Sequence, residues 1–491
     1  METTSNLTQP TRREFLGMVT ATAMSAASYN RVLGANDRVG IGIIGFGLIS
    51  KTHIQGWRTY KDVDILGLCD VYKPRVQEGL AYTQNPNCKG YSDFRKMLED
   101  KNIQGIFVGT PDHWHTMMTI MACAAGKDVY VEKPLTVYND EGKWMIQARD
   151  KYNRVVVAGT QRNHNPGHLV AQKIVKSGVL GKIHLVKMAG SSRNVYPGFG
   201  KTPVENPPAD LDYDMWLGPA PKKPYQKHRA LYHFRWFWDY SGGQLTNLGA
   251  HSVSAFLLVT GVKGPTKVVS FGGRLLLEDD GETPDTQDVM YEFPGFRMTM
   301  SVREANGFRD STGTVVMGTK GNLLLGSNTI ISELRGNPFN RVPRGGDGHP
   351  IGGVVYDDTP NVPWIEGAPT SVPAAGGRGG GGGEDRERGS RNRAPSPLAP
   401  ADFPGEDMLY LNQRDFIECI RTRKKPWCDL EMGHRTAIIC NLGNMSLRLG
   451  GRTIHWDPDK EVVIGDKEAA AMCTPQYRAP WDGVLRSLIK V

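Results

Sequence analysis

Residues Glu132-Lys133-Pro134 carry the strongest chemical signal in this chain of 491 residues. They follow a short run, Asp128–Val131, that is typical of a buried strand. A lysine at the carboxyl edge of a parallel sheet lies where a nucleotide and a substrate would meet. With a lowered pKa it could exchange a proton with a substrate hydroxyl, and Pro134 helps to hold the turn by restricting the backbone. Taken alone, the motif also fits an ordinary surface lysine, so its neighbours decide between the two interpretations.

A glycine-rich turn, Gly45-Phe46-Gly47-Leu48-Ile49-Ser50, closes the apolar run over residues 39–44. Gly45 and Gly47 permit a tight turn and let backbone N–H groups approach a pyrophosphate, and the following helix adds the positive end of its dipole. Asp70 ends the next predicted strand, where it could accept hydrogen bonds from the ribose hydroxyls of NAD. Lys73 and Arg75 keep NADP open as the second choice.

A second loop, residues 109–115, also joins a predicted strand to a predicted helix. Thr110 and Pro111 are expected to form the wall beside the nicotinamide half of the cofactor, and His115 is expected to face the same cleft. The alternative for His115 is a helix residue near the surface.

Short apolar runs alternate with helix-like segments over residues 36–160, which predicts an α/β Rossmann domain with a doubly wound parallel sheet. From residue 161 one helix is followed by alternating, β-branched runs, which predict an α+β domain with an open, mostly antiparallel sheet. This second domain is expected to comprise residues 161–340 and 403–491. A flexible insertion rich in Gly, Pro and Arg is predicted between them, over residues 341–402.

Composition favours a globular protein, with 39% hydrophobic and 22% charged residues. The net charge of +8 comes largely from arginines in the N-terminal segment and the insertion, so nucleic-acid binding is not expected. The seven cysteines include no C-x-x-C pair, and neither a disulfide framework nor a bound metal is predicted.

Residues 1–35 have the pattern of a twin-arginine export signal, because Arg12-Arg13 precede Phe15-Leu16 and a stretch of small residues. This pattern predicts a periplasmic protein that is exported already folded, with a disordered tail as the alternative. The stretch is too short and too polar for a stable membrane span.

These motifs resemble those of the Gfo/Idh/MocA oxidoreductases, the family of glucose–fructose oxidoreductase and inositol dehydrogenase, and the chain looks most like its exported, twin-arginine members. The resemblance covers residues 38–335 and 403–491. It rests on Gly45-x-Gly47, Asp70, Thr110-Pro111 with His115, Glu132-Lys133-Pro134, and the segment GGQLTNLGAH at residues 242–251. It implies hydride transfer between a nicotinamide cofactor and a sugar or polyol, with Lys133 as the catalytic lysine and His251 as the general acid or base.

Two positions depart from the family pattern, since Asn247 and Ser254 stand where the family commonly has aspartates. Asn247 can still position a substrate hydroxyl, and we include it among the catalytic residues, but it brings no negative charge to His251 or Lys133. Asp239 or Asp285 could compensate.

Aromatic residues and cations gather over residues 225–240, which suits a carbohydrate, although packing of the rings in the domain core is the alternative. His233 and Arg235 are the predicted substrate contacts there. Arg162 and His164, beyond the last Rossmann strand, are further candidates.

Three functions fit these features. The first is a sugar or polyol dehydrogenase; the second is a redox-neutral, NAD-dependent glycosidase or lyase that retains its cofactor; the third is a non-catalytic sugar or nucleotide binder. An open sheet in the second domain also predicts a homo-oligomer formed through that sheet.

Overall fold

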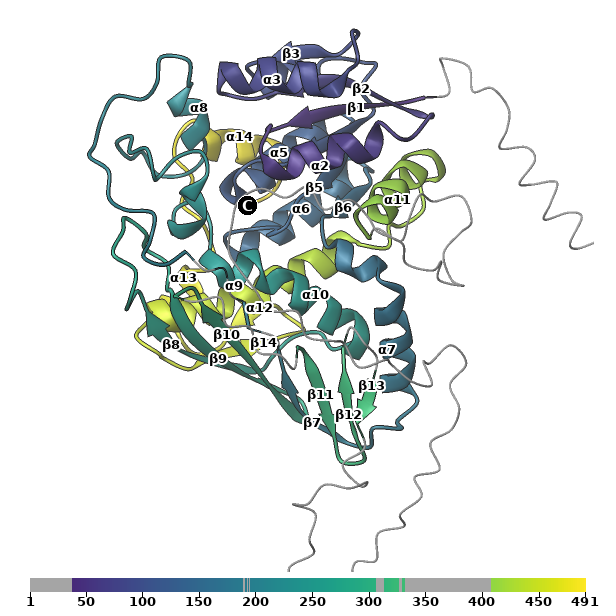
Figure 1. Cartoon of the computed structure of the whole chain (residues 1–491), viewed down its shortest axis with the longest axis vertical. Coiled ribbons are helices and arrows are strands. Elements are labelled where there is room, and N and C mark those ends of the chain that lie inside the picture. Colours follow the sequence, from purple (N-terminus) through teal and green to yellow (C-terminus); the bar gives the residue numbers. More distant parts are fainter. Residues whose placement is uncertain are drawn as a thin grey trace, which may run out of the picture.

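The computed structural model of the protein describes residues 38–305, 313–325, 329–331 and 408–491, apart from residues 189, 192 and 194. The predicted export signal and the predicted insertion lie outside the described residues. Two sheets stand at opposite ends of the described part, with helices between them (Figure 1).

The first sheet is a Rossmann sheet of six parallel strands in the order β3-β2-β1-β4-β5-β6. The strands are β1 (Val39–Ile44), β2 (Val63–Cys69), β3 (Lys89–Tyr91), β4 (Gly105–Val108), β5 (Asp128–Val131) and β6 (Val156–Ala158). Every residue of β1, β4, β5 and β6 is buried, as expected for a parallel sheet covered on both faces. The strand order reverses between β1 and β4, and a sheet of this kind binds its ligand in the crevice at that point.

Helices on both faces of this sheet complete the predicted doubly wound fold. They are α2 (Leu48–Trp57), α3 (Lys73–Thr83), α4 (Phe94–Leu98), α5 (His115–Ala124) and α6 (Asn139–Lys151), with a short 3-10 helix at Asp112–Trp114.

The second sheet has nine strands in the order β13-β12-β11-β7-β10-β9-β8-β14-β15. All of its pairs are antiparallel except β7 with β10, which confirms the predicted mostly antiparallel sheet. The strands are β7 (Ile183–Lys187), β8 (Lys267–Gly273), β9 (Thr286–Phe293), β10 (Phe296–Arg303), β11 (Val315–Gly318), β12 (Asn322–Leu324), β13 (Thr329–Ile331), β14 (Ile454–Asp457) and β15 (Val462–Val463).

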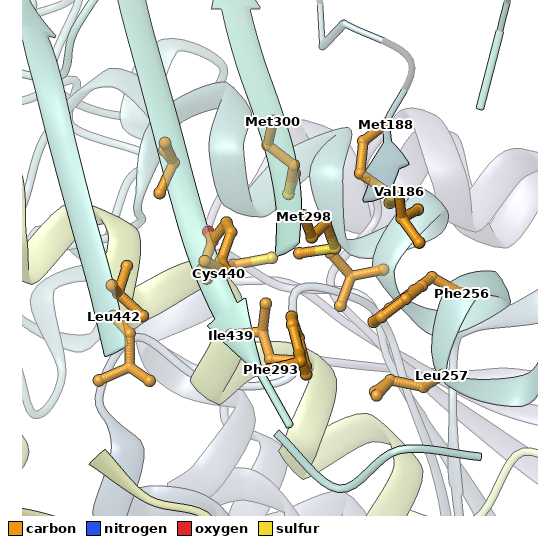
Figure 2. Packing of buried hydrophobic residues seen from close by; sticks show 14 of the residues in the cluster. Val186, Met188, Phe256, Leu257, Phe293, Met298, Met300, Ile439, Cys440 and Leu442 are labelled. Carbon is orange, nitrogen blue, oxygen red and sulfur yellow. The ribbon is translucent and has the colours of Figure 1, made fainter. Parts of the chain in front are cut away.

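One face of this sheet packs on α7 (Pro166–Lys176), α10 (Gly249–Thr260) and α12 (Leu430–Arg448). Phe256, Met298 and Ile439 meet in this core, which Figure 2 shows from close by. Because this packing holds α10 against the sheet, the turn of chain that precedes α10 has a fixed position.

Two helices of the C-terminal segment cover the Rossmann domain, although they follow the second domain in sequence. Phe416 and Ile417 of α11 (Met408–Thr422) pack with the core residues of β1 and β2, and Trp481 of α14 (Trp481–Leu488) packs on Trp114. The remaining elements are short: α8 (Tyr213–Leu217), α9 (Gly243–Asn247), α13 (Lys467–Ala471) and 3-10 turns at Gln161–His164 and His233–Trp236.

Within the described part of the chain, no helix is both long enough and apolar enough to cross a bilayer. The same residues contain no group of three or more metal-ligating side chains, and all seven cysteines are free thiols.

Candidate active site

A cavity of about 430 Å³ lies at the carboxyl ends of β1 and β4 and extends toward the second domain. The glycine turn lines one end of it, and Lys133, Asn247 and His251 line the other. The two ends thus bring together residues from three separate segments of sequence.

At the first end, the turn after β1 is shaped for a close approach. Gly45 has φ +87°, and an added Cβ there would lie 2.8 Å from the carbonyl oxygen of Gly109. A Cβ on Gly47 would meet no atom within 4 Å, so the backbone lies open on that side. Leu48 and Ile49 begin α2, whose first N–H groups have no partner within the helix. The predicted contacts Gly45, Phe46, Gly47, Leu48 and Ile49 all line the cavity.

Asp70 also lines the cavity and is tied to the turn. Its Oδ2 accepts a hydrogen bond of 2.8 Å from the backbone N–H of Phe46, and its Oδ1 accepts one of 2.9 Å from Tyr72. Burial raises the pKa of this carboxyl, against the lowering effect of Arg75 and of these N–H groups. Asp70 therefore both supports the glycine turn and offers its remaining lone pairs to a ribose.

The loop from Thr110 to His115 supplies part of the opposite wall. Thr110 and Pro111 line the cavity, and the Thr110 hydroxyl is buried without a hydrogen-bond partner among the described residues. His115 is completely buried beneath that wall, where its ring nitrogens contact the carbonyl oxygens of Pro134, at 2.8 Å, and Thr110, at 3.0 Å. The prediction that His115 faces the cleft is therefore wrong, because both ring nitrogens are engaged in joining the two loops.

The Glu132 side chain is held by hydrogen bonds within the Rossmann domain. Its Oε1 lies 2.8 Å from Nε2 of the buried His53 on α2, and its Oε2 accepts from the N–H of Lys133 at 3.1 Å. These contacts orient the turn that carries Lys133 into the cavity.

Lys133 and Asn247 form one of the contacts between the two domains at the cavity. Nζ of Lys133 donates to Oδ1 of Asn247 at 2.9 Å and to its backbone oxygen at 3.1 Å. Burial lowers the pKa of Lys133, and so do the nearby Arg235 and Arg193, against Glu132 and Asp112. The lysine is therefore shifted toward the neutral amine that can accept a proton.

His251 lies on the first turn of α10, one helical turn after Asn247. Its Nδ1 is buried without a partner among the described residues, so Nε2 is the ring nitrogen that can reach a substrate. Burial, Lys133 and Arg162 lower its pKa well below the ordinary value, which favours the neutral ring. The Ser254 hydroxyl donates to the backbone oxygen of His251, not to its imidazole ring.

Besides Glu132, a second carboxyl acts on Lys133, that of Asp112. It is buried at the cavity wall, accepts a hydrogen bond of 2.5 Å from Ser241, and raises the pKa of Lys133. Asp239 pairs with Lys223 instead, and Asp285 accepts backbone N–H groups elsewhere in the second domain, so neither compensates for Asn247. Asp112 was not among the predicted residues, although it stands in the same loop as Thr110 and Pro111.

Of the four predicted substrate residues, only Arg235 lines the cavity. Its guanidinium packs over the ring of Phe234 and donates to the carbonyl oxygen of Tyr232 at 3.0 Å. His233 stacks on Phe199, and His164 bonds Asn412, so both are engaged outside the cavity. Arg162 also lies outside the lining, and its charge lowers the pKa of His251. None of these three residues lines the cavity, and their contact with a substrate stays a prediction.

Family models match most of the chain. The model for the NAD-binding Rossmann fold of the oxidoreductase family matches residues 39–160, and that for its C-terminal alpha/beta domain matches residues 168–270 and 402–483. A further GFO/IDH/MocA C-terminal domain model matches residues 221–324. The chain belongs to the Gfo/Idh/MocA oxidoreductase family. Its first domain is accordingly an NAD-binding Rossmann domain.

Curated relatives in this family include several inositol dehydrogenases, of which two serve as examples. The chain is 27% identical over 181 residues to inositol 2-dehydrogenase of Salmonella paratyphi B, which is 36% of this chain and 53% of that protein. It is 26% identical over 157 residues to myo-inositol 2-dehydrogenase of Thermotoga maritima, which is 32% of this chain and 46% of that protein. The chain thus matches about half the length of these Gfo/Idh/MocA relatives.

Solved Gfo/Idh/MocA-like structures share the fold. The WlbA dehydrogenase of Bordetella pertussis, in complex with NADH and UDP-GlcNAcA, superposes with a TM-score of 0.57 at 18% identity, over 86% of this chain and 99% of that one. A levoglucosan dehydrogenase in complex with NADH and levoglucosan gives a TM-score of 0.55 at 16% identity, over 85% of this chain and 99% of that one.

Proposed function

We propose that this Gfo/Idh/MocA protein is a nicotinamide-dependent dehydrogenase that oxidises a hydroxyl of a sugar or polyol, or reduces the corresponding carbonyl. One observation carries the proposal: the amino group of Lys133, with a lowered pKa, projects into the same cavity as the glycine turn and lies beside Asn247 and His251. A proton acceptor and a nucleotide-binding turn in one cavity are the requirements of hydride transfer from an alcohol.

NAD fits the glycine end of the cavity. The open backbone at Gly47, the start of α2 and the carboxyl of Asp70 would hold its pyrophosphate and adenosine ribose, and the unpartnered hydroxyl of Thr110 would meet its nicotinamide half. When bound, the cofactor supplies the hydride acceptor. We favour NAD over NADP because a carboxylate at Asp70 disfavours a 2′-phosphate.

The proton is handled by residues of this chain. In the oxidation direction, neutral Lys133 takes the proton of the substrate hydroxyl, while Asn247 holds the lysine and Nε2 of His251 contacts the same or a neighbouring hydroxyl. A carbonyl forms as the hydride leaves the carbon. In the reverse direction the Lys133 ammonium returns the proton.

A panel assay tests this function. The purified protein is mixed with NAD or NADP and with sugars, polyols and glycosides, and the nicotinamide absorbance is followed in the wild type, in Lys133→Ala and in Lys173→Ala. Lys173 is an exposed lysine of α7 and serves as the matched control. Net NADH formation that is lost only in Lys133→Ala supports a dehydrogenase.

Two other outcomes would contradict the proposal. Release of an aglycone that requires bound NAD, without net NADH, would identify the redox-neutral glycosidase or lyase. Bound nucleotide with no turnover of any sugar would identify a binding protein.

We also propose that the protein is exported to the periplasm by the twin-arginine route, on the strength of Arg12-Arg13 and the small-residue stretch that follows. The pair Arg12→Lys and Arg13→Lys should retain the protein in the cytoplasm on cell fractionation. Equal periplasmic amounts of both forms would contradict this route.

A further inference from the structure

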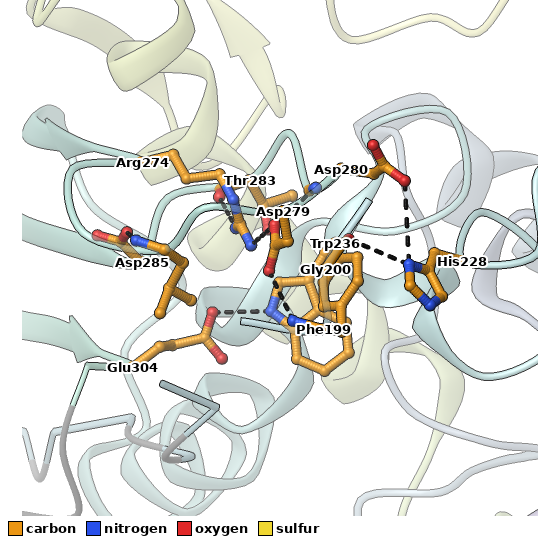
Figure 3. Close-up of polar contacts among 12 residues, drawn as sticks. Phe199, Gly200, His228, Trp236, Arg274, Asp279, Asp280, Thr283, Asp285 and Glu304 are labelled. Carbon is orange, nitrogen blue, oxygen red and sulfur yellow. Dashed lines mark hydrogen bonds and ion pairs between the residues drawn. The ribbon is translucent and has the colours of Figure 1, made fainter. Parts of the chain in front are cut away.

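Glu304 carries a buried carboxyl that lies outside the cavity. The proposed chemistry does not use this group. Glu304 follows β10 and has no exposed surface. Its Oε2 accepts a hydrogen bond of 2.8 Å from the indole N–H of Trp236, as Figure 3 shows, and its Oε1 has no partner among the described residues. A carboxyl that is half satisfied in the protein interior is costly unless it has a role.

Two charged side chains act on Glu304, and each has other partners, although Nε of Arg274 and Oδ1 of Asp285 are buried without a hydrogen bond among the described residues. Arg274 pairs with Asp279, and Oδ2 of Asp285 accepts three backbone N–H groups (Figure 3). Burial raises the pKa of Glu304 to about 7, against the lowering effect of Trp236, Gln244 and Arg274, while Asp285 adds to the rise. Glu304 therefore changes its charge near neutral pH.

Two buried amides connect Glu304 to the lysine. Oδ1 of Asn247 accepts from Nζ of Lys133 at 2.9 Å, so Nδ2 of Asn247 points away, and it donates to Oε1 of Gln244 at 3.0 Å. This leaves Nε2 of Gln244 as the free donor of that amide, and the Gln244 side chain lies near enough to Glu304 to lower the pKa of its carboxyl. Neither Nε2 nor the free oxygen of Glu304 makes a closed hydrogen bond with a described residue, and each supplies the donor or acceptor that the other lacks.

We propose that Glu304 is a positioning residue for Lys133, because it holds the Gln244 amide as a donor and so fixes Asn247 with Oδ1 toward the lysine. The inference rests on the proposed function, in which Lys133 exchanges the substrate proton. Each amide could otherwise turn over, and a reversed Asn247 would present its NH₂ group to the ammonium. A carboxylate only accepts, so it selects one of the two orientations along the chain.

The relay depends on the charge of Glu304. When the carboxyl takes up a proton, its hydroxyl can donate, and the Gln244 amide is free to reverse. The oriented Asn247 oxygen stabilises the ammonium of Lys133, so the pKa of the lysine should be higher when Glu304 is ionised. Asn247 brings no charge itself. In the proposed relay the fixed acceptor is Glu304, which acts on Asn247 through the Gln244 side chain.

Competitive acetylation tests the relay without cofactor or substrate. The full chain is treated with trace acetic anhydride at several pH values, and the labelling of Lys133 relative to Lys173 is measured by mass spectrometry in the wild type and in Glu304→Gln. Near pH 6 the two proteins should label Lys133 equally, because position 304 is uncharged in both. Near pH 8 the variant should label about threefold faster, which corresponds to a drop of about half a unit in the pKa of Lys133.

The alternatives give different results. The deciding quantity is the labelling of Lys133 in Glu304→Gln divided by that in the wild type. If this ratio is the same at both pH values, the proposal is overturned, because a purely structural role would not depend on a charge that appears only above pH 7. Glu304→Asp keeps the charge and should restore much of the wild-type labelling. Glu292→Gln, at a carboxyl on the outer face of β9, is the matched control and should change nothing.

A second variant protects the test against misfolding. Gln244→Leu cuts the same relay at its middle, so it should reproduce the pH-dependent ratio even if Glu304→Gln does not fold. Folding of each variant is checked by thermal unfolding. Because labelling needs no turnover, a failed dehydrogenase assay beside a positive labelling result would reject the proposed function and keep the relay.

Discussion

His53 on α2 and Glu132 at the end of β5 form a buried pair that holds the lysine turn, with 2.8 Å between Nε2 and Oε1. Nε2 of Gln413 on α11 donates to both the backbone oxygen of His53, at 3.0 Å, and its Nδ1, at 2.8 Å. Nδ1 is therefore an acceptor, and the proton of a neutral ring lies on Nε2, where it is donated to Glu132. Helix α11, from the C-terminal segment, thus sets the tautomer of a histidine that supports the active site.

Replacing His53 by Leu should destabilise the protein, because it leaves the Glu132 carboxylate buried without this donor. We expect a loss of at least about 3 kcal/mol in the free energy of unfolding. Urea unfolding of His53→Leu, Glu132→Gln and the double variant measures it. The histidine change should cost less in the Glu132→Gln background, and equal costs in both backgrounds would show that the two residues are not coupled.

Asn247→Asp should move the activity profile to higher pH. The new carboxylate would lie about where Oδ1 now lies, 2.9 Å from Nζ, and would raise the pKa of Lys133. The oxidation rate needs neutral lysine, so its rise with pH should shift upward by roughly 1–3 units. The pH dependence of kcat/KM checks this, with Asn247→Ser as the uncharged control, and an unmoved profile would contradict the role of Lys133 as the base.

Arg235→Gln should also shift the pH profile of oxidation upward, but by removing a positive charge instead of adding a negative one. Arg235 is a cation that lowers the pKa of Lys133, so its removal raises that pKa and the rate should again rise at higher pH. Its guanidinium also lines the cavity, so KM for substrate should increase. Arg235→Lys keeps the charge and should raise KM while leaving the pH profile in place. A profile that shifts equally in both variants would exclude the charge as the cause.

Asp70→Asn should weaken NADH binding and reduce the preference over NADPH. The amide can still accept from Phe46, which keeps the turn, but it loses the charged acceptor for a ribose. A loss of about tenfold in affinity for NADH corresponds to about 1.4 kcal/mol, close to the lower end of the range for a hydrogen bond to a charged group. Fluorescence titration with both cofactors measures it. An unchanged ratio of the two affinities would mean that Asp70 does not select the cofactor.

The outer face of the second sheet offers a surface for self-association. Phe271 on β8 and Met290 on β9 are 65% and 49% exposed, and Val269 lies between them, directly opposite Met290. Large exposed apolar side chains on adjacent strands indicate an interface. We propose that the protein forms a homo-oligomer there, and Phe271→Glu should lower the mass measured by light scattering. A monomeric wild type, or an unchanged oligomer in the variant, would refute this.

Much of the Rossmann domain could be predicted because its strands are buried on both faces and so appear as continuous apolar runs. The strand β3 carries no such run, since Lys89 and Gly90 are exposed at the sheet edge, and sequence patterns missed it. The helix α10 was also missed: it is apolar on nearly all sides because it is enclosed between the sheet and α12, so it lacks an amphipathic pattern.

The sequence by itself determined the local chemistry of this protein. The glycine turn, Asp70 and the lysine turn each depend on a few consecutive residues, whose backbone preferences and strand ends place them at one edge of the sheet. Only the tertiary structure decided which side chains meet there. Asp112 joins Ser241, His53 joins Gln413, and Lys133 joins Asn247 through contacts between segments far apart in the chain. Such pairings follow from how the two domains pack, and packing is a property of the whole chain rather than of any local pattern.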